Sequence, residues 1–249
     1  MQAVILVGGK GTRLKPLTEK IPKPLVPVHG RPFIHYLFDR LRAQGITDIL
    51  LCIGHLGSQF RELLGDGSSL GLHISYAEEK ELLGTAGAIK NAASLLEQDF
   101  LLLNGDTLFD IDYGSLAAFH KEKDALLTFA VRLSVDPEED SREQRSGEQR
   151  QRGVISIDEV GRVLSFEEKP TSLLSNNHYV NGGAVMVSKR ILASIPAGRP
   201  VSLEREIVPQ LINTKTLFAK EFKGYFIDMG TMASLRQLEK DLSLLEASG

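Results

Sequence analysis

The chain has 249 residues, with ordinary hydrophobic (42%) and charged (24%) contents and a formal net charge of −3, so a large core is expected and a nucleic-acid-binding protein, which needs a basic face, is not. Its one cysteine, Cys52, excludes an internal disulfide and is expected to be a buried strand residue in a reducing compartment. No apolar run reaches membrane-spanning length and the first residues lack the layout of a signal peptide, so we expect no membrane contact and a cytoplasmic location.

Short apolar strands alternate with amphipathic helical patterns along the chain. Strands are expected at residues 3–7, 49–53, 73–77, 100–103 and 126–131, and helices at residues 32–44, 86–96 and 232–245. This alternation is typical of a mostly parallel sheet with helices on both faces. The prediction is a three-layer α/β/α Rossmann-like fold with a predominantly parallel mixed sheet, in a single domain over residues 1–249.

The pattern changes at residues 136–152, where ten of seventeen residues are charged and none is aliphatic. Such a composition predicts a mobile, solvated loop, although docking of a partner stays open. The chain then returns with strand patterns at residues 154–157 and 163–166, separated by a turn at residues 159–161. This spacing predicts a small β-hairpin appended to the sheet.

A glycine-rich, basic loop follows the first strand. Gly8, Gly9 and Gly11 allow successive backbone amides to point into one concavity that binds an anion, and Arg13 and Lys23 add positive charge. Open α/β sheets bind ligands beyond the carboxyl ends of their strands, which is where this loop lies. The spacing matches neither the dinucleotide loop GxGxxG nor the Walker loop GxxxxGK[ST]. A polyphosphate is the ligand that the loop suits best.

The run GGKGTRLKPLT, followed by PKPL, resembles the signature of the sugar-1-phosphate nucleotidyltransferases. The resemblance implies that the glycine loop and Arg13 hold the triphosphate of an NTP and that Lys23 reaches the reacting phosphates. The expected catalytic residues are Arg13, Lys23 and, from a later segment, Lys169. Flanking prolines are expected to hold Lys23 in an extended conformation. The nucleotide-binding residues expected on this basis are Leu6, Gly8, Gly9, Gly11, Thr12, Arg13, Glu79, Gly84 and Thr85.

Two aspartates follow apolar strand patterns, Asp106 in LLLNGD and Asp228 in YFIDMG. From the residues alone, each also suits a helix N-cap or a turn. In the family the matching residues bind magnesium, a hard cation that prefers oxygen ligands. The resemblance therefore implies Mg²⁺ as cofactor, held by Asp106 and Asp228.

The sugar phosphate is expected to bind a second set of residues. Glu168, Lys169 and Pro170 resemble the family's EKP element, which implies that Lys169 meets the sugar's phosphate and Glu168 a sugar hydroxyl. An exposed, salt-bridged hairpin end is the alternative. The run VNGG resembles the sugar-pocket strand, which implies that Asn181 binds sugar hydroxyls and that Gly182 leaves room for the ring. Gly105 is also expected to contact the sugar phosphate.

The base is expected at residues 78–87, whose sequence EEKELLGTAG resembles the family's base-binding loop. A carboxylate such as Glu79 can accept two hydrogen bonds from the N1–H and N2–H₂ edge of guanine, whereas uracil offers one donor. The loop therefore favours GTP over UTP. Solvated surface glutamates remain the alternative interpretation.

The resemblance covers nearly the whole chain and is strongest with the family's guanylyltransferases of D-glycero-α-D-manno-heptose 1-phosphate. It implies transfer of a nucleoside monophosphate from an NTP to a sugar 1-phosphate, with release of pyrophosphate. Mannose-1-phosphate guanylyltransferase and N-acetylmuramate-1-phosphate uridylyltransferase are the alternatives, and a homodimer stays open. A glycosyltransferase of similar, GT-A-like fold, with Asp110 and Asp112 as its DxD motif, and a catalytically inactive nucleotide-sugar sensor are more distant alternatives.

Overall fold

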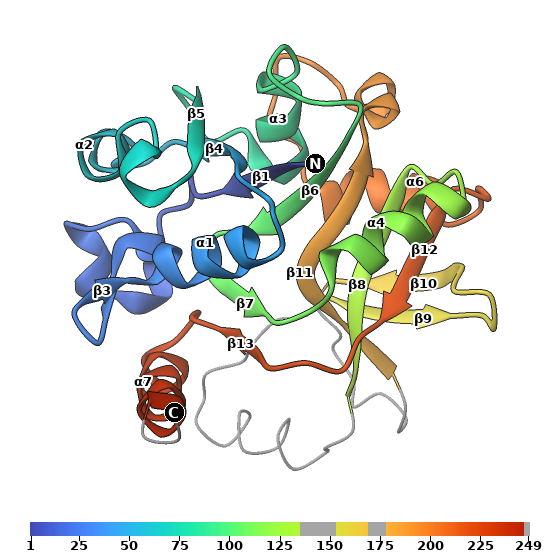
Figure 1. Ribbon diagram of the computed structural model, residues 1–249. Coiled ribbons are helices and arrows are strands. Elements are labelled where there is room, and N and C mark those ends of the chain that lie inside the picture. The colour runs from blue at the N-terminus through green and yellow to red at the C-terminus, as the bar shows by residue number, and fades with distance from the viewer. Residues whose placement is uncertain (135–152, 169–177, 247–249) are drawn as a thin grey trace.

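The computed structural model describes residues 1–134, 153–168 and 178–246. The charged segment at residues 136–152 and the predicted catalytic residue Lys169 lie outside these ranges. The described chain folds into a central sheet with helices on both of its faces (Figure 1).

The strands are β1 (Gln2–Leu6), β2 (Pro27–Val28), β3 (Arg31–Pro32), β4 (Asp48–Ile53), β5 (His73–Glu78), β6 (Asp99–Asn104), β7 (Thr107–Phe109), β8 (Leu127–Ser134), β9 (Val154–Ile157), β10 (Val163–Glu167), β11 (His178–Ser188), β12 (Leu217–Glu221) and β13 (Phe226–Asp228). The helices are α1 (Phe33–Ala43), α2 (Ser58–Leu64), α3 (Gly84–Asn91), α4 (Tyr113–Glu122), α6 (Val208–Leu211) and α7 (Met232–Glu246). Short turns important for the site are the 3₁₀ turns η1 (Thr12–Leu14) and η3 (Lys23–Leu25) and the π-helical turn η6 (Leu203–Ile207).

Within the described residues the main sheet has nine strands, with β10-β9-β11-β6-β1-β4-β5 as its longest path. β5, β4, β1 and β6 are parallel to one another, and β11 joins β6 in the antiparallel direction. β8 pairs with β11 and with the parallel strand β12. The sheet is therefore mixed and mostly parallel, and the predicted fold class is confirmed.

Strand residues alternate between two hydrophobic clusters, one on each face of the sheet. Ala3 and Ile5 of β1 pack with α1, α2 and α7, whereas Val4 packs with α3 and α6. Successive side chains of a strand point to opposite faces, so a strand buried on both sides must be apolar throughout. This explains the uninterrupted apolar runs that marked the first strands in the sequence.

The predicted hairpin forms as the antiparallel pair β9–β10 at one edge of the sheet. One predicted helix has different bounds, because α3 begins at Gly84 and ends at Asn91. Beyond Asn91 the carbonyls of Leu95 and Leu96 accept hydrogen bonds from the side chains of Gln2 (3.0 Å) and Lys189 (2.7 Å). These carbonyls thus accept from side chains and not from N–H groups of a continuing helix. The helix ends at Asn91, although the apolar pattern in the sequence continues.

A separate two-stranded pair, β7–β13, lies beside the main sheet (Figure 1). It matches Asp228 with Thr107, and the Met229 N–H donates to the Asp106 carbonyl at 2.8 Å. Two segments far apart in the sequence are thereby joined at the edge where β6 ends. None of the helices in the described part of the chain combines the length and hydropathy of a membrane span.

Candidate active site

A cavity of about 500 Å³ opens at the carboxyl ends of β1, β4 and β6. Every residue expected to bind the nucleotide lines it, together with Lys23 and Asp106. The cavity is lined by Leu6, Val7, Gly8, Gly9, Gly11, Thr12, Arg13, Lys23, Pro24, Cys52, Glu79, Leu82, Gly84, Thr85, Ala88, Asn104, Asp106 and Gly230. The glycine loop therefore borders open space large enough for a small-molecule ligand.

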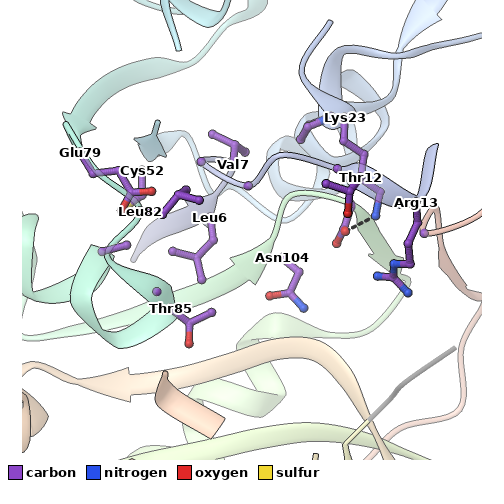
Figure 2. A pocket seen from close by; sticks show the side chains of 18 residues that line it. Leu6, Val7, Thr12, Arg13, Lys23, Cys52, Glu79, Leu82, Thr85 and Asn104 are labelled. Atoms are coloured by element: carbon purple, nitrogen blue, oxygen red, sulfur yellow. Dashed lines mark hydrogen bonds and ion pairs between the residues drawn. The ribbon is translucent and has the colours of Figure 1, made fainter. Parts of the chain in front are cut away.

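The two ends of the cavity differ in chemistry. Figure 2 shows Glu79, Cys52 and Leu82 at one end and Lys23, Thr12 and Arg13 at the other. The first end combines apolar side chains with the Glu79 carboxylate. The second end places the positive charges of Arg13 and Lys23 beside the glycine loop. An elongated ligand with a planar polar ring at one end and phosphates at the other matches this division.

Glu79 is held close to the backbone of the glycine loop. A Cβ placed at Gly8 would lie 2.5 Å from Glu79 Oε1, so a larger residue at this position would displace the carboxylate. The Leu83 N–H donates to Glu79 Oε2 at 3.1 Å. Burial raises the pKa of Glu79, and the hydrogen bond from Leu83 offsets only part of that rise. A partly desolvated carboxylate in this position is a strong hydrogen-bond acceptor for a ligand.

Lys23 lies between the two predicted metal-binding carboxylates. Its ammonium donates to Asp106 Oδ2 and lies 3.8 Å from Asp228 Oδ1. The exposed fractions of the three side chains are 8% for Lys23, 30% for Asp106 and 20% for Asp228. Burial by itself raises the pKa of Asp106, but the charge and hydrogen bond of Lys23 outweigh it, so the pKa lies below the ordinary carboxyl value.

These carboxylates fit a divalent cation. They converge on one positive charge, the Lys23 ammonium, and both offer hard oxygen ligands. Within the described ranges no group of three or more His, Cys, Asp or Glu residues suits a metal. Magnesium usually takes one or two carboxylates and completes its coordination with waters and substrate phosphates, so two aspartates are sufficient.

The predicted sugar-side residues Gly105, Glu168, Asn181 and Gly182 do not line the cavity. A Cβ at Gly182 would collide with the ring of Phe109, and the expectation that Gly182 leaves room for a sugar ring stays a prediction. The glycine therefore lets the β11 backbone pass close to the Phe109 ring. Asn181 Oδ1 accepts a hydrogen bond from the Gly183 N–H at 3.0 Å, at the bulge where β11 changes register against β8.

The predicted extended backbone at Lys23 is wrong. Lys23 begins the 3₁₀ turn η3, which the Val26 N–H closes by donating to the Lys23 carbonyl at 3.1 Å. Pro22, just before the turn, is extended, and the turn points the lysine inward, so that its side chain is nearly buried.

A family model described as "Nucleotidyl transferase" matches residues 2–243. The chain belongs to this family.

Three relatives of this nucleotidyltransferase bear on its site. A mannose-1-phosphate guanylyltransferase of Mycobacterium tuberculosis is 37% identical over 234 residues, 93% of this chain and 61% of that protein. A D-glycero-alpha-D-manno-heptose 1-phosphate guanylyltransferase of Campylobacter jejuni is 35% identical over 232 residues, 92% of this chain and 95% of that protein. HddC from Yersinia pseudotuberculosis, solved in complex with GMP-PN, has a TM-score of 0.79 at 29% identity. The match covers 97% of this chain and 99% of the HddC chain. The nucleotidyltransferase thus spans about three-fifths of its mycobacterial relative and nearly all of the other two.

Sequence reasoning missed two parts of the site of this nucleotidyltransferase. Asn104 lines the cavity at the end of β6, where a polar residue after an apolar strand was the available signal. The segment at residues 201–206 supports the start of α3 through hydrogen bonds to Thr85 and its neighbours. These bonds join residues far apart in the chain, so no local pattern revealed them.

The two aspartates of the glycosyltransferase alternative have other partners. Asp110 forms an ion pair with Arg40 at 3.0 Å, and Asp112 caps α4 by accepting from the Ser115 N–H at 2.9 Å. Neither residue lines the cavity. This arrangement argues against a DxD metal site in the nucleotidyltransferase.

Cys52 of the nucleotidyltransferase should resist thiol reagents in the folded state. Its side chain is almost fully buried, and burial raises the pKa of the thiol to about 12, so the reactive thiolate is scarce at neutral pH. We expect labelling by a chromogenic disulfide reagent to be slow in buffer and complete within minutes in denaturant. Fast labelling of the native protein, at the rate of a free thiol, would contradict the buried position.

Proposed function

We propose that this chain is a guanylyltransferase that transfers GMP from GTP to D-glycero-α-D-manno-heptose 1-phosphate and releases pyrophosphate. The proposal is supported by the near full-length similarity to the Campylobacter enzyme of that name and to HddC, whose solved complex contains GMP-PN. Since GTP is a cytoplasmic metabolite, the proposal implies a cytoplasmic reaction.

The arrangement of the cavity carries the proposal. Glu79 lies at one end and offers acceptor oxygens, whereas Arg13 and Lys23 lie at the other beside Asp106 (Figure 2). Guanine presents two adjacent donors, which suit a carboxylate, and a triphosphate suits paired cations. One ligand, GTP, accounts for both ends.

The reaction joins two negatively charged molecules, so its barrier is largely electrostatic. In the proposed mechanism an oxygen of the sugar 1-phosphate attacks the α-phosphorus of GTP, and the bond to pyrophosphate breaks. Arg13 and Lys23 stabilise negative charge on the transferring and leaving phosphates. The attacking phosphate is already ionised at neutral pH, so no general base is required.

Asp106 and Asp228 would hold magnesium in this proposal. The bound ion would neutralise phosphate charge and orient the phosphates. Lys169 would neutralise the phosphate of the incoming sugar, and Glu168 would accept a hydrogen bond from a sugar hydroxyl.

Pyrophosphate release across four NTPs and several sugar 1-phosphates tests the assignment. The expected result is highest kcat/KM for GTP with the heptose phosphate. GTP with mannose 1-phosphate, or UTP with N-acetylmuramate 1-phosphate, would instead select one of the alternatives. No pyrophosphate with any pair, while GTP still binds, would favour a sensor and overturn the proposal.

Glu79→Gln should weaken the preference for GTP. A glutamine offers one acceptor oxygen and turns an NH₂ donor toward the donor edge of guanine, so we expect kcat/KM for GTP to fall roughly 10- to 100-fold relative to UTP. Glu78→Gln is the matched control, since the neighbouring Glu78 pairs with Arg61 at 3.3 Å and does not line the cavity. Equal GTP preference in both variants would remove Glu79 from base recognition.

A further inference from the structure

The start of α3, which forms one wall of the cavity, is fastened to the segment at residues 201–206. The Leu203 N–H donates to Thr85 Oγ1 at 2.7 Å, and the Thr85 hydroxyl donates to Glu204 Oε2 at 2.7 Å. Thr85 has one hydroxyl proton, which is used in this pair of bonds. Thr85 therefore faces the cavity with its hydroxyl already engaged by the segment behind it.

The backbone repeats this connection. The Val201 carbonyl accepts from the N–H groups of Ala86 (3.0 Å) and Gly87 (3.2 Å), and the Val201 N–H donates to the Leu83 carbonyl at 2.7 Å. The first N–H groups of a helix lack partners inside the helix and must be satisfied elsewhere. The Val201 carbonyl satisfies two of them, so the segment sets the position of the helix start and, through Leu83, that of Glu79.

The next residue of the same segment reaches the sugar side. Arg205 Nε donates to Glu168 Oε2, and the two side chains are 57% and 29% exposed. Glu168 is the last described residue of the hairpin, and it is the residue proposed to accept a sugar hydroxyl. Two adjacent residues thus have different partners: Glu204 contacts Thr85, and Arg205 contacts Glu168.

The local structure explains how neighbours reach different loops. Leu203 and Ile207 are buried at either end of η6 and fix this turn in the hydrophobic cluster beneath the sheet. The Ser202 side chain accepts from the Arg205 N–H at 3.2 Å and caps the turn. Single π-helical turns are uncommon and are often found at functional sites.

We propose that η6 (Leu203–Ile207) sets Thr85 and Glu168 relative to each other, with Glu204 as the positioning residue for the nucleotide and Arg205 as the positioning residue for the sugar phosphate. The inference rests on the proposed function. Arg205 orients the Glu168 carboxylate toward the sugar, and Glu204 fixes Thr85 and the Leu83 backbone that holds Glu79. Neither residue needs to touch a reacting atom.

Steady-state kinetics with separate KM values test this arrangement. Arg205→Met should raise KM for the sugar 1-phosphate about tenfold, the effect of losing one charge-assisted hydrogen bond, and leave KM for GTP within about twofold. Glu204→Gln should do the reverse and raise KM for GTP about fivefold. Arg205→Lys, which keeps the charge, should recover part of the sugar-phosphate affinity.

A double-mutant cycle separates orientation of Glu168 from an independent effect. If Arg205 acts through Glu168, Arg205→Met should add nothing to the defect of Glu168→Gln. Arg190→Met is the matched control, because Arg190 is 47% exposed and pairs with Asp124 at 2.8 Å outside the cavity. Arg205 is exposed and its ion pair contributes little to folding, so the Arg205 variants should melt within about 2 °C of the wild type.

The inference fails if the wild type is active but Arg205→Met leaves both KM values unchanged or raises them equally. It also fails if the Arg205 and Glu168 defects are additive. Should Arg205→Met not fold, Arg205→Lys carries the same test through a smaller rise in the same KM. A wild type that binds GTP but transfers nothing overturns the proposed function first, so the two failures are distinguishable.

Discussion

Asp106→Asn should lower kcat by roughly 100- to 1,000-fold, with KM for GTP changed far less. The substitution keeps the size of the side chain but removes one of the two carboxylates that converge on the cation position. Charge stabilisation in the transition state depends on that position, whereas much of the ground-state affinity comes from the glycine loop and the base. Pyrophosphate release at saturating sugar phosphate measures the effect.

Asp110→Asn is the control for this experiment. It removes the same charge from a strand-end aspartate four residues along, which pairs with Arg40 outside the cavity. Its kcat should stay within about twofold of the wild type, in line with substitutions at independent surface sites. Activity lost in Asp110→Asn and kept in Asp106→Asn would exchange the two roles and revive the glycosyltransferase alternative.

Lys23→Met should lower both activity and stability. The lysine reaches the reacting phosphates in the proposed mechanism, so kcat/KM should fall by roughly 1,000-fold. Its removal also leaves Asp106 and Asp228 facing each other without the ammonium, at a cost of about 2 kcal/mol of unfolding free energy once partial exposure is considered. Thermal unfolding without nucleotide measures the second effect.

Magnesium should restore part of the stability of Lys23→Met. In the variant the carboxylate pair is open to a divalent cation, so its melting temperature should rise with Mg²⁺ concentration. The wild type should respond much less, since its own ammonium neutralises the pair. Equal responses of the two proteins would show that Lys23 does not compete with the cation for these carboxylates.

The pH dependence of stability follows from the same contact. The pKa of Asp106 is lowered in the folded protein, so the contribution of the pair is fully present above the ordinary carboxyl pKa of about 4. It is lost as pH falls from there through the lowered pKa. Lys23→Met should lack this component, and the difference in unfolding free energy between wild type and variant should shrink in acid.

The sheet and the glycine loop were predictable because their sequence signals are local. Apolar runs such as the one around Val4 mark strands buried on both faces, and Gly8 to Gly11 mark a loop at the end of one. The environment of Gly182 was not predictable, since the Phe109 ring that fills its space lies on another strand. The contacts of Glu204 and Arg205 were missed for the same reason. Periodicity reports which face is buried and says little about which distant polar groups meet.

The strand pair β7–β13 has a consequence for how the two carboxylates are brought together. Asp106 gains its companion carboxylate only when β13 aligns beside β7, and the two strands lie far apart in the sequence. A C-terminally shortened chain would already carry the glycine loop and most of the pocket wall, yet it would lack Asp228. The pair of carboxylates is therefore completed only once β13 has formed, and truncation before Phe226 should yield an inactive product.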